Sequence, residues 1–175
     1  MRSKILVAYA TKYGATAEIA EKIGEVLSQA GVSVDVLPVS QVKDPGSYGA
    51  VVLGSAVYIG RWRKEASRFL KANQKLLAER PLWIFSSGPT GKGDPVELTE
   101  GWRFPKALQP LVDSIKPRAI VVFHGAIDTN KMKPLEKWMI EKVGAATEDS
   151  RDWDSIASWA KAIASAVAAE LGQAR

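Results

Sequence analysis

The sequence predicts a three-layer α/β fold built on a doubly wound, five-stranded parallel sheet in the order 2-1-3-4-5. Two observations lead to this prediction. Short apolar segments alternate with helix-like segments along the whole chain of 175 residues, which implies right-handed crossovers and helices on both faces of a parallel sheet. Hydrophobic residues make up 46% and charged residues 25% of the chain, as in ordinary globular proteins. Since no repeat or linker interrupts the alternation, we expect residues 1–175 to form a single domain.

The strands are predicted from short runs of apolar residues. Four of these runs are almost continuously apolar, which is typical of strands that are buried on both faces of a parallel sheet. The second run alternates polar and apolar residues and therefore belongs nearer the edge of the sheet. In chain order, the predicted strands are Ile5–Tyr9, Val32–Leu37, Ala50–Leu53, Leu82–Phe85 and Ala119–Phe123.

The helices are predicted from apolar residues that recur every three or four positions. The first repeat, from Ile19 to Ala30, ends before Gly31, and glycine commonly terminates a helix. Residues 54–63 and 86–104 lack a sustained period, and we expect loops there. The second predicted helix begins after the loop at 54–63 and ends at about Leu77. The third runs from Pro105 to Ile115, and two amphipathic helices follow at Met132–Val143 and Ile156–Val167.

Composition excludes several classes of function. The chain has no cysteine, which excludes thiolate catalysis, disulfide bonds and cysteine-ligated zinc or iron–sulfur centres. The single histidine, His124, argues against a histidine-based metal site and is expected to have a structural role. No apolar run approaches the ~20 residues needed to span a bilayer, and the N-terminus lacks the features of a signal peptide. We therefore expect a soluble, cytoplasmic protein without a bound metal.

The charge balance favours anionic partners. Lysine and arginine number 24 against 19 aspartates and glutamates, a net charge of +5 at pH 7. Such a balance suits phosphate-bearing ligands, nucleic acid or a negatively charged membrane face, without selecting among them. The pairs Glu136-Lys137 and Glu141-Lys142 are typical of a solvated helix face. The apolar residues between them, Trp138–Ile140, either contact a membrane or quinone or pack against the sheet and a neighbouring helix.

The segment Ala10–Thr16, between the first predicted strand and helix, has the composition of a phosphate-binding loop. It combines the hydroxyls of Thr11 and Thr16, a glycine at Gly14 and the unpaired amides of a helix N-terminus, all of which suit a phosphate. It lacks the Gly-Lys-Ser/Thr of a Walker loop and the three spaced glycines of a Rossmann fingerprint, which favours a mononucleotide. In the alternative interpretation, Thr16 only caps the helix and Gly14 only forms the turn.

This loop resembles the phosphate loop of the flavodoxin family, Thr/Ser-x-Thr-Gly-x-Thr. Tyr13 departs from the pattern, since flavodoxins usually have threonine there. The resemblance extends over nearly the whole chain and implies a flavodoxin-like fold with FMN as the cofactor. It also implies that the FMN 5′-phosphate is bound by Thr11, Lys12, Tyr13, Gly14, Ala15 and Thr16.

The resemblance assigns the isoalloxazine ring to the loops after the third and fourth predicted strands. In the first of these, Gly60 would face flavin N5, and Tyr58 or Trp62 would stack on the ring, with simple packing against the next helix as the alternative for both aromatics. The residues implied in the loop after the third strand are Ala56, Val57, Tyr58, Ile59 and Gly60. Those implied after the fourth strand, where they would bind the pyrimidine oxygens, are Ser86, Ser87, Gly88, Pro89, Thr90 and Gly91.

Three features differ from those of an electron-carrying flavodoxin: the net positive charge, a second loop that is one residue longer, and a third loop without the usual stacking tyrosine. In these features the chain is similar to flavodoxin-like quinone oxidoreductases and to the bacterial menaquinone-dependent protoporphyrinogen oxidase family. The C-terminal part of this resemblance lies in Gly125–Ile127, Lys137–Lys142 and Asp152–Asp154.

The resemblance implies an FMN-dependent oxidoreductase that passes reducing equivalents from a bulky, porphyrin-like substrate through FMN to a quinone. We expect small-molecule partners and a peripheral contact with an anionic membrane rather than nucleic acid. No residue is singled out as an acid or base catalyst. Two alternatives stay open: a non-enzymatic electron carrier of the flavodoxin type, and a flavin-free binding module with the same fold.

Overall fold

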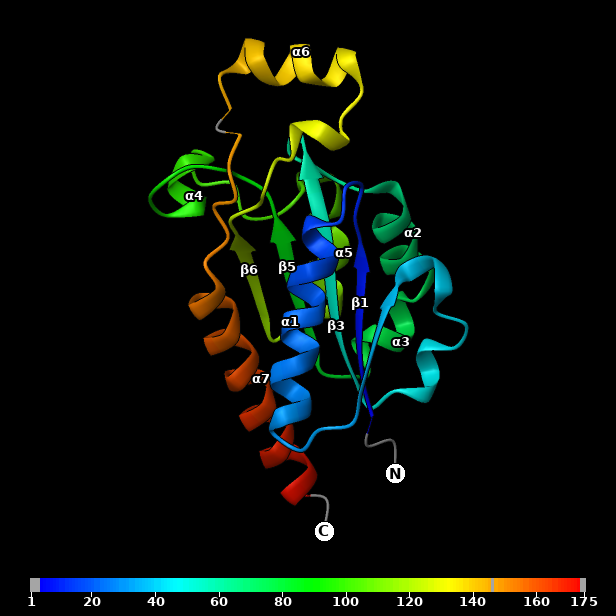
Figure 1. Cartoon of the computed structure of the whole chain (residues 1–175). Coiled ribbons are helices and arrows are strands. Elements are labelled where there is room, and N and C mark those ends of the chain that lie inside the picture. Colours follow the sequence, from blue (N-terminus) through cyan, green and yellow to red (C-terminus); the bar gives the residue numbers. More distant parts are fainter. Residues whose placement is uncertain (1–3, 146, 174–175) are drawn as a thin grey trace.

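The computed structural model describes residues 4–145 and 147–173 and contains the expected doubly wound sheet (Figure 1). Five parallel strands lie in the order β2-β1-β3-β5-β6. A further two-residue strand, β4 (Arg61–Trp62), pairs antiparallel with the end of β3. Without this hairpin the order is the predicted 2-1-3-4-5, so the predicted fold class is confirmed. The parallel strands are β1 (Ile5–Ala10), β2 (Val34–Pro38), β3 (Ala50–Tyr58), β5 (Leu82–Ser87) and β6 (Ala119–Phe123).

Helices cover both faces of the sheet. One face carries α1 (Ala15–Gln29) and α7 (Trp153–Gln173), and the other carries α2 (Lys64–Ala72), α3 (Gln74–Ala78) and α5 (Gln109–Ile115) (Figure 1). The helices α4 (Pro95–Leu98) and α6 (Pro134–Val143) lie near the end of the sheet to which the parallel strands point. Within the described ranges, no helix combines the length and apolarity needed to cross a bilayer. Short 3₁₀ helices lie at Val39–Gln41, Pro45–Ser47, Lys106–Leu108 and Thr129–Lys131.

Alternation along the central strands divides the core in two. Leu6 of β1 packs with Leu70 of α2 on one face, whereas Val7, the next residue, packs with Ile19 of α1 and Ile163 of α7 on the other. All five side chains are buried. Full burial of a side chain of this size contributes about 1.5–3 kcal/mol, so apolar residues in nearly continuous runs stabilise a sheet that is covered on both sides.

The register of the sheet brings the carboxyl ends of its central strands to one level. Ala10 of β1 lies opposite Ser55 of β3, and Ser55 in turn lies opposite Ser86 of β5. The loops that follow these strands therefore meet at the same edge, as expected for a ligand site in a doubly wound fold.

The predicted end of the third strand, at Leu53, is wrong. The strand β3 continues to Tyr58, because β1 and β5 pair with its two sides up to residues 55 and 56 and β4 pairs with its last two residues. Residues 54–58, predicted as a loop, therefore belong to the sheet. Trp62 is buried and packs edge-on against Phe104 with the ring centroids 5.0 Å apart, which favours the packing alternative for this aromatic.

Two helical predictions also differ from the structure. The helix expected to run to Leu77 is divided at Asn73, whose side-chain amide donates to the carbonyl of Phe69 over 2.8 Å and satisfies the end of α2. The expected loop at 86–104 contains the short helix α4. The carboxylate of Asp94 caps this helix by accepting the N–H groups of residues 96 and 97, an arrangement that favours a helix start.

Candidate functional site

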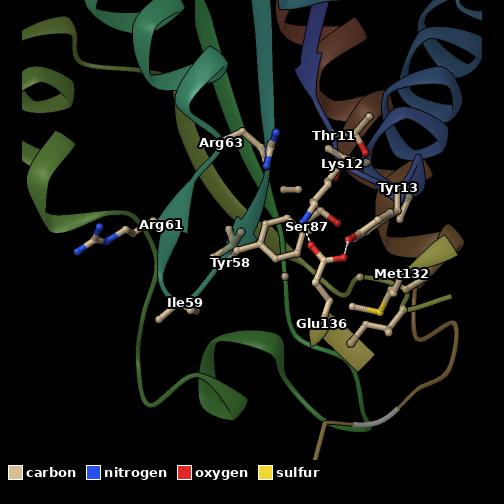
Figure 2. A pocket seen from close by; sticks show the side chains of 18 of the residues that line it. Thr11, Lys12, Tyr13, Tyr58, Ile59, Arg61, Arg63, Ser87, Met132 and Glu136 are labelled. Carbon is tan, nitrogen blue, oxygen red and sulfur yellow. Dashed lines mark hydrogen bonds and ion pairs between the residues drawn. The ribbon is translucent and has the colours of Figure 1, made fainter. Parts of the chain in front are cut away.

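A cavity of about 970 Å³ lies at the carboxyl ends of the central strands, within the size range of small-molecule sites. Its walls come from the loop after β1, the β3–β4 hairpin with the start of α2, the end of β5, and the segment from the end of β6 through α6. Figure 2 shows these side chains converging from elements that are far apart in the sequence. The edge of the sheet predicted from the strand pattern is therefore the edge that holds the cavity.

The loop between β1 and α1 presents an uncapped helix N-terminus to the cavity. Gly14, with φ of +98°, is the N-cap residue of α1, and no side chain caps this helix. The Gly14 N–H donates to Thr11 Oγ1 over 3.0 Å. Thr16 is buried, and its Oγ1 has no hydrogen-bond partner among the residues that the structure describes. The alternative in which Thr16 serves only as a helix cap is therefore excluded.

Glu136 of α6 contacts the same loop. Its carboxylate accepts hydrogen bonds from Lys12 Nζ, with which it forms an ion pair, from the Tyr13 hydroxyl and from the backbone N–H of Lys133 (Figure 2). The hydrogen bonds from Lys12 and Tyr13 lower the pKa of Glu136 to about 2. The bond to Glu136 also raises the pKa of Lys12. The carboxylate therefore binds these two side chains as an oxyanion, and the expectation of a purely solvated face at Glu136 is wrong.

The β3–β4 hairpin forms an aromatic wall of the cavity. Tyr58 lines it with a partly exposed ring, and Lys12 Nζ lies 5.7 Å from the centroid of that ring. At the tip of the hairpin, Ile59 and Gly60 have φ values of +51° and +65°, the two positive values that a two-residue type I′ turn requires. A β-branched residue in this conformation is strained. The Ile59 side chain at this tip is 88% exposed.

The end of β5 and the loop after it are held by polar contacts. Ser86 Oγ accepts the indole N–H of Trp62 over 2.8 Å, so this hydroxyl is engaged in the core. His124 is buried, and its Nδ1 and Nε2 lie 3.2 Å and 2.7 Å from the carbonyl oxygens of Pro89 and Gly93. These contacts give His124 the structural role expected of it, since they fasten the loop after β5 to the end of β6.

Most of the residues implied by the sequence line the cavity, and some do not. Every implied residue of the first loop except Gly14 lines the cavity, and so does every implied residue of the second loop except Gly60. Only Ser87 and Gly88 of the third loop line it. The implied residues outside the lining are Gly14, Gly60, Ser86, Pro89, Thr90 and Gly91.

Sequence reasoning missed one wall of the cavity. This wall consists of the segment after β6 and one side of α6, and no spacing in the sequence indicated that it would fold over the loop after β1. The lining residues Lys64 and Glu65 at the start of α2 were also missed. The additional lining residues are Arg61, Trp62, Arg63, Lys64, Glu65, Gly125, Ala126, Ile127, Asp128, Met132, Glu136, Met139, Ile140 and Val143.

Comparisons with known proteins agree with the fold. The flavodoxin domain family matches residues 6–154 of the chain. Protoporphyrinogen IX dehydrogenase (quinone) of Escherichia coli strain K12 is 24% identical over 173 residues, which cover 92% of this chain and 94% of that protein.

Solved structures share the fold. An archaeal flavodoxin superimposes with a TM-score of 0.61 at 17% identity, over 94% of this chain and 98% of its own. The oxidised Flavodoxin 2 of Bacillus cereus gives a TM-score of 0.58 at 20% identity, over 93% and 98% of the two chains.

Proposed function

The chain belongs to the flavodoxin domain family, and from this we propose that it is an FMN-binding oxidoreductase that passes reducing equivalents from a bulky porphyrinogen-type substrate to a quinone. The observation that carries the proposal is the buried, unpartnered hydroxyl of Thr16, in the first turn of an uncapped helix whose N-terminal loop lines a cavity. The relative in Escherichia coli, protoporphyrinogen IX dehydrogenase (quinone), supports the choice of substrate and acceptor.

The residues of the first loop fit the phosphate group of FMN. A buried hydroxyl without a partner costs about 1–3 kcal/mol, and a phosphate oxygen at Thr16 would remove that cost. The positive end of α1 and its free first-turn amides favour an anion at the same position. Lys12 and Tyr13 donate hydrogen bonds to the Glu136 carboxylate, which indicates that the side chains of this loop also bind an oxyanion.

The cavity offers more than a phosphate site. Bound FMN would supply the chemistry itself, by accepting hydrogen from a reduced organic substrate and delivering it to a quinone. The residues of this chain would position the partners: Tyr58 presents an aromatic face, and Ile127, Met132 and Ile140 form an apolar wall of the cavity. Such a wall suits a large, weakly polar ring system, which supports an enzyme with an accessible flavin over a pure electron carrier.

Two measurements test the proposal. Flavin-free protein should bind FMN at least tenfold more tightly than riboflavin, because charge-assisted hydrogen bonds to a phosphate contribute about 1.5–3 kcal/mol each. Equal affinity for the two flavins would contradict the assignment of the first loop.

The second measurement compares two steady-state assays of the FMN-loaded protein. One supplies protoporphyrinogen and a menaquinone analogue, and the other supplies a flavodoxin reductase and a cytochrome. We expect multiple turnovers in the first assay. Rapid turnover in the second assay alone would identify an electron carrier, and absence of flavin binding would leave a binding module of the same fold.

A further inference from the structure

Two buried side-chain atoms in the described part of the chain lack a hydrogen-bond partner, and both belong to residues that line the cavity. They are Thr16 Oγ1 and Arg63 Nε. The hydroxyl lies in the proposed phosphate loop, whereas Arg63 has no part in that assignment. A guanidinium has five N–H donors in a planar fork and no acceptor, so the Nε–H of Arg63 is a donor that the described residues leave unused.

The backbone of Arg63 is firmly placed. Its N–H donates to Ser55 Oγ over 3.0 Å, and its carbonyl accepts the N–H and the hydroxyl of Ser67 in α2 over 3.1 and 3.2 Å. Ser55 is itself fully buried in β3. These contacts anchor the residue between the sheet and α2, so only the side chain of Arg63 is free to adjust to a ligand.

The guanidinium of Arg63 is directed into the cavity. Figure 2 shows it turned toward the side chains of Lys12 and Tyr58, whereas the side chain of Arg61 extends away from them. Burial raises the pKa of the Tyr58 phenol, and the charges of Lys12 and Arg63 oppose that rise, which agrees with a guanidinium close to this ring. Arg68, an exposed arginine of α2 that does not line the cavity, provides a matched control with the same charge.

The contacts that Arg63 makes within the chain leave capacity for a ligand. Its Nη2 lies 3.2 Å from Glu65 Oε1, but that carboxylate is about half exposed, and ion pairs at such positions are weak and screened by salt. The neighbouring cation Lys12 is already paired with Glu136. Arg63 is therefore placed to supply the positive charge for an additional anionic group in this cavity.

We propose that Arg63 is an anion-binding residue of the cavity, and that its guanidinium takes a planar or tetrahedral oxyanion of the bound ligand. The chemistry fits a phosphate or a carboxylate, since both accept the parallel N–H bonds of arginine. Which molecule carries the group rests on the proposed function: either the phosphate of FMN or a carboxylate of the porphyrinogen-type substrate. Because Nε is shielded in the present rotamer, a rotation of the guanidinium accompanies binding.

The test compares Arg63→Gln with Arg68→Gln, which removes the same charge from α2 outside the cavity, and with Arg63→Lys, which keeps the charge but not the fork. Thermal unfolding of each variant first establishes that it is folded. Flavin-free proteins are titrated with FMN, riboflavin and phenyl phosphate, and FMN-loaded proteins with protoporphyrin IX and its dimethyl ester. FMN differs from riboflavin, and protoporphyrin IX from its dimethyl ester, only in the anionic group, and phenyl phosphate tests the phosphate alone.

If Arg63 binds the phosphate, Arg63→Gln weakens FMN and phenyl phosphate binding about tenfold or more and leaves riboflavin unchanged. If it binds the carboxylate, the same variant keeps its FMN affinity and loses the preference for protoporphyrin over the dimethyl ester. In both cases Arg68→Gln behaves as the wild type and Arg63→Lys recovers part of the affinity. Equal behaviour of the two glutamine variants with every probe would overturn the proposal.

The same titrations separate this proposal from the proposed function. Wild-type protein that binds no flavin would defeat the function, yet a loss of phenyl phosphate or porphyrin binding confined to Arg63→Gln would still establish the anion site. Conversely, an unchanged FMN affinity in all variants, with porphyrin discrimination also unchanged, would defeat the Arg63 site and leave the function standing.

Discussion

Single residues in the cavity lack partners or adopt strained conformations, and these features have measurable consequences. Thr16 keeps a buried hydroxyl that nothing in the described chain satisfies, and Ile59 adopts a left-handed backbone that a β-branched residue disfavours. Each costs stability in the ligand-free protein. Such costs are commonly retained at functional sites, and substitution of either residue should therefore separate stability from binding.

Thr16→Val should stabilise the flavin-free protein and weaken FMN binding. The valine keeps the buried shape and removes a hydroxyl without a partner, so we expect the free energy of unfolding to rise by about 1 kcal/mol. The affinity for FMN should fall about tenfold or more, because one charge-assisted hydrogen bond is lost. Denaturant titration and flavin fluorescence measure the two effects, with Thr16→Ser as the control that retains the hydroxyl. A fall in both quantities would mean that the hydroxyl is satisfied in the free protein.

Ile59→Asn should stabilise the hairpin. Asn-Gly is the favoured dipeptide of a type I′ turn, and relief of the left-handed strain is worth about 1–2 kcal/mol. The Ile59 side chain is exposed, so little burial is lost in return. Chemical denaturation of Ile59→Asn and of Ile59→Val, which retains the strain, checks this expectation. Equal stability of the two variants would show that the turn relaxes in solution.

At the scale of elements, α6 stands apart from the core. None of its residues is buried, whereas its Glu136 reaches the loop between β1 and α1. A helix with few buried apolar contacts has a low local stability. Polar contacts with the loop therefore contribute much of the stability that keeps α6 over the cavity. Ligand entry should therefore depend on the bonds between Glu136 and its partners Lys12 and Tyr13.

Glu136→Gln should loosen α6 without unfolding the sheet. The amide cannot form the ion pair with Lys12, so the amides of α6 should exchange with solvent several-fold faster, and FMN should associate faster. Hydrogen exchange and stopped-flow fluorescence report these changes. Glu141→Gln, on the same helix, is the control, because Glu141 does not line the cavity. Unchanged exchange in α6 of Glu136→Gln would mean that other contacts hold the helix.

The pH dependence of this contact follows from the direction of the shift. The pKa of Glu136 is lowered from 4.5 to about 2, first by the hydrogen bond from Lys12 and then by that from Tyr13. Because the pKa is lower in the folded state, the ionised carboxylate contributes its full stabilisation above about pH 4.5. This stabilisation is lost as the pH falls toward 2. Protection of the α6 amides, corrected for intrinsic exchange rates, should therefore be constant from about pH 6 to 8 and decrease below about pH 4. A change in this protection between pH 6 and 8 would mean that another titrating group keeps α6 in place.

For the whole molecule, the sequence predicted the sheet and the edge that holds the site better than it predicted the segment that lies over the cavity. Buried parallel strands are apolar throughout, so their number and order could be inferred, and with them the edge where the loops meet. The contact between Lys12 and Glu136 joins positions 124 residues apart, and an alternation of Glu and Lys is typical of any solvated helix. Similarly, residues 54–58 resembled a loop because small and polar residues follow the apolar run. They nevertheless continue β3, because β1 and β5 pair with its two sides.

The exposed side of α6 gives the molecule an apolar face beside the cavity. Leu135 and Val143 are 68% and 75% exposed, Trp138 is about half exposed, and Lys142 Nζ lies 4.4 Å from the Trp138 ring. Aromatic and aliphatic side chains next to lysines favour the interface of an anionic bilayer, where each lysine near the surface contributes about 1 kcal/mol. A quinone dissolved in that bilayer would then be close to the cavity that α6 covers.

The protein should therefore bind vesicles that contain phosphatidylglycerol more strongly than vesicles of phosphatidylcholine alone, and salt should weaken the binding because it screens the lysines. The double substitution Trp138→Ser with Val143→Ser should reduce cosedimentation several-fold without changing thermal stability, since both side chains are largely in solvent. Leu98→Ser, which removes an exposed apolar side chain from α4, serves as the control and should leave binding unchanged. Equal binding to the two kinds of vesicle, or equal loss in the control, would mean that α6 faces only the cavity and that the quinone must reach the site through water.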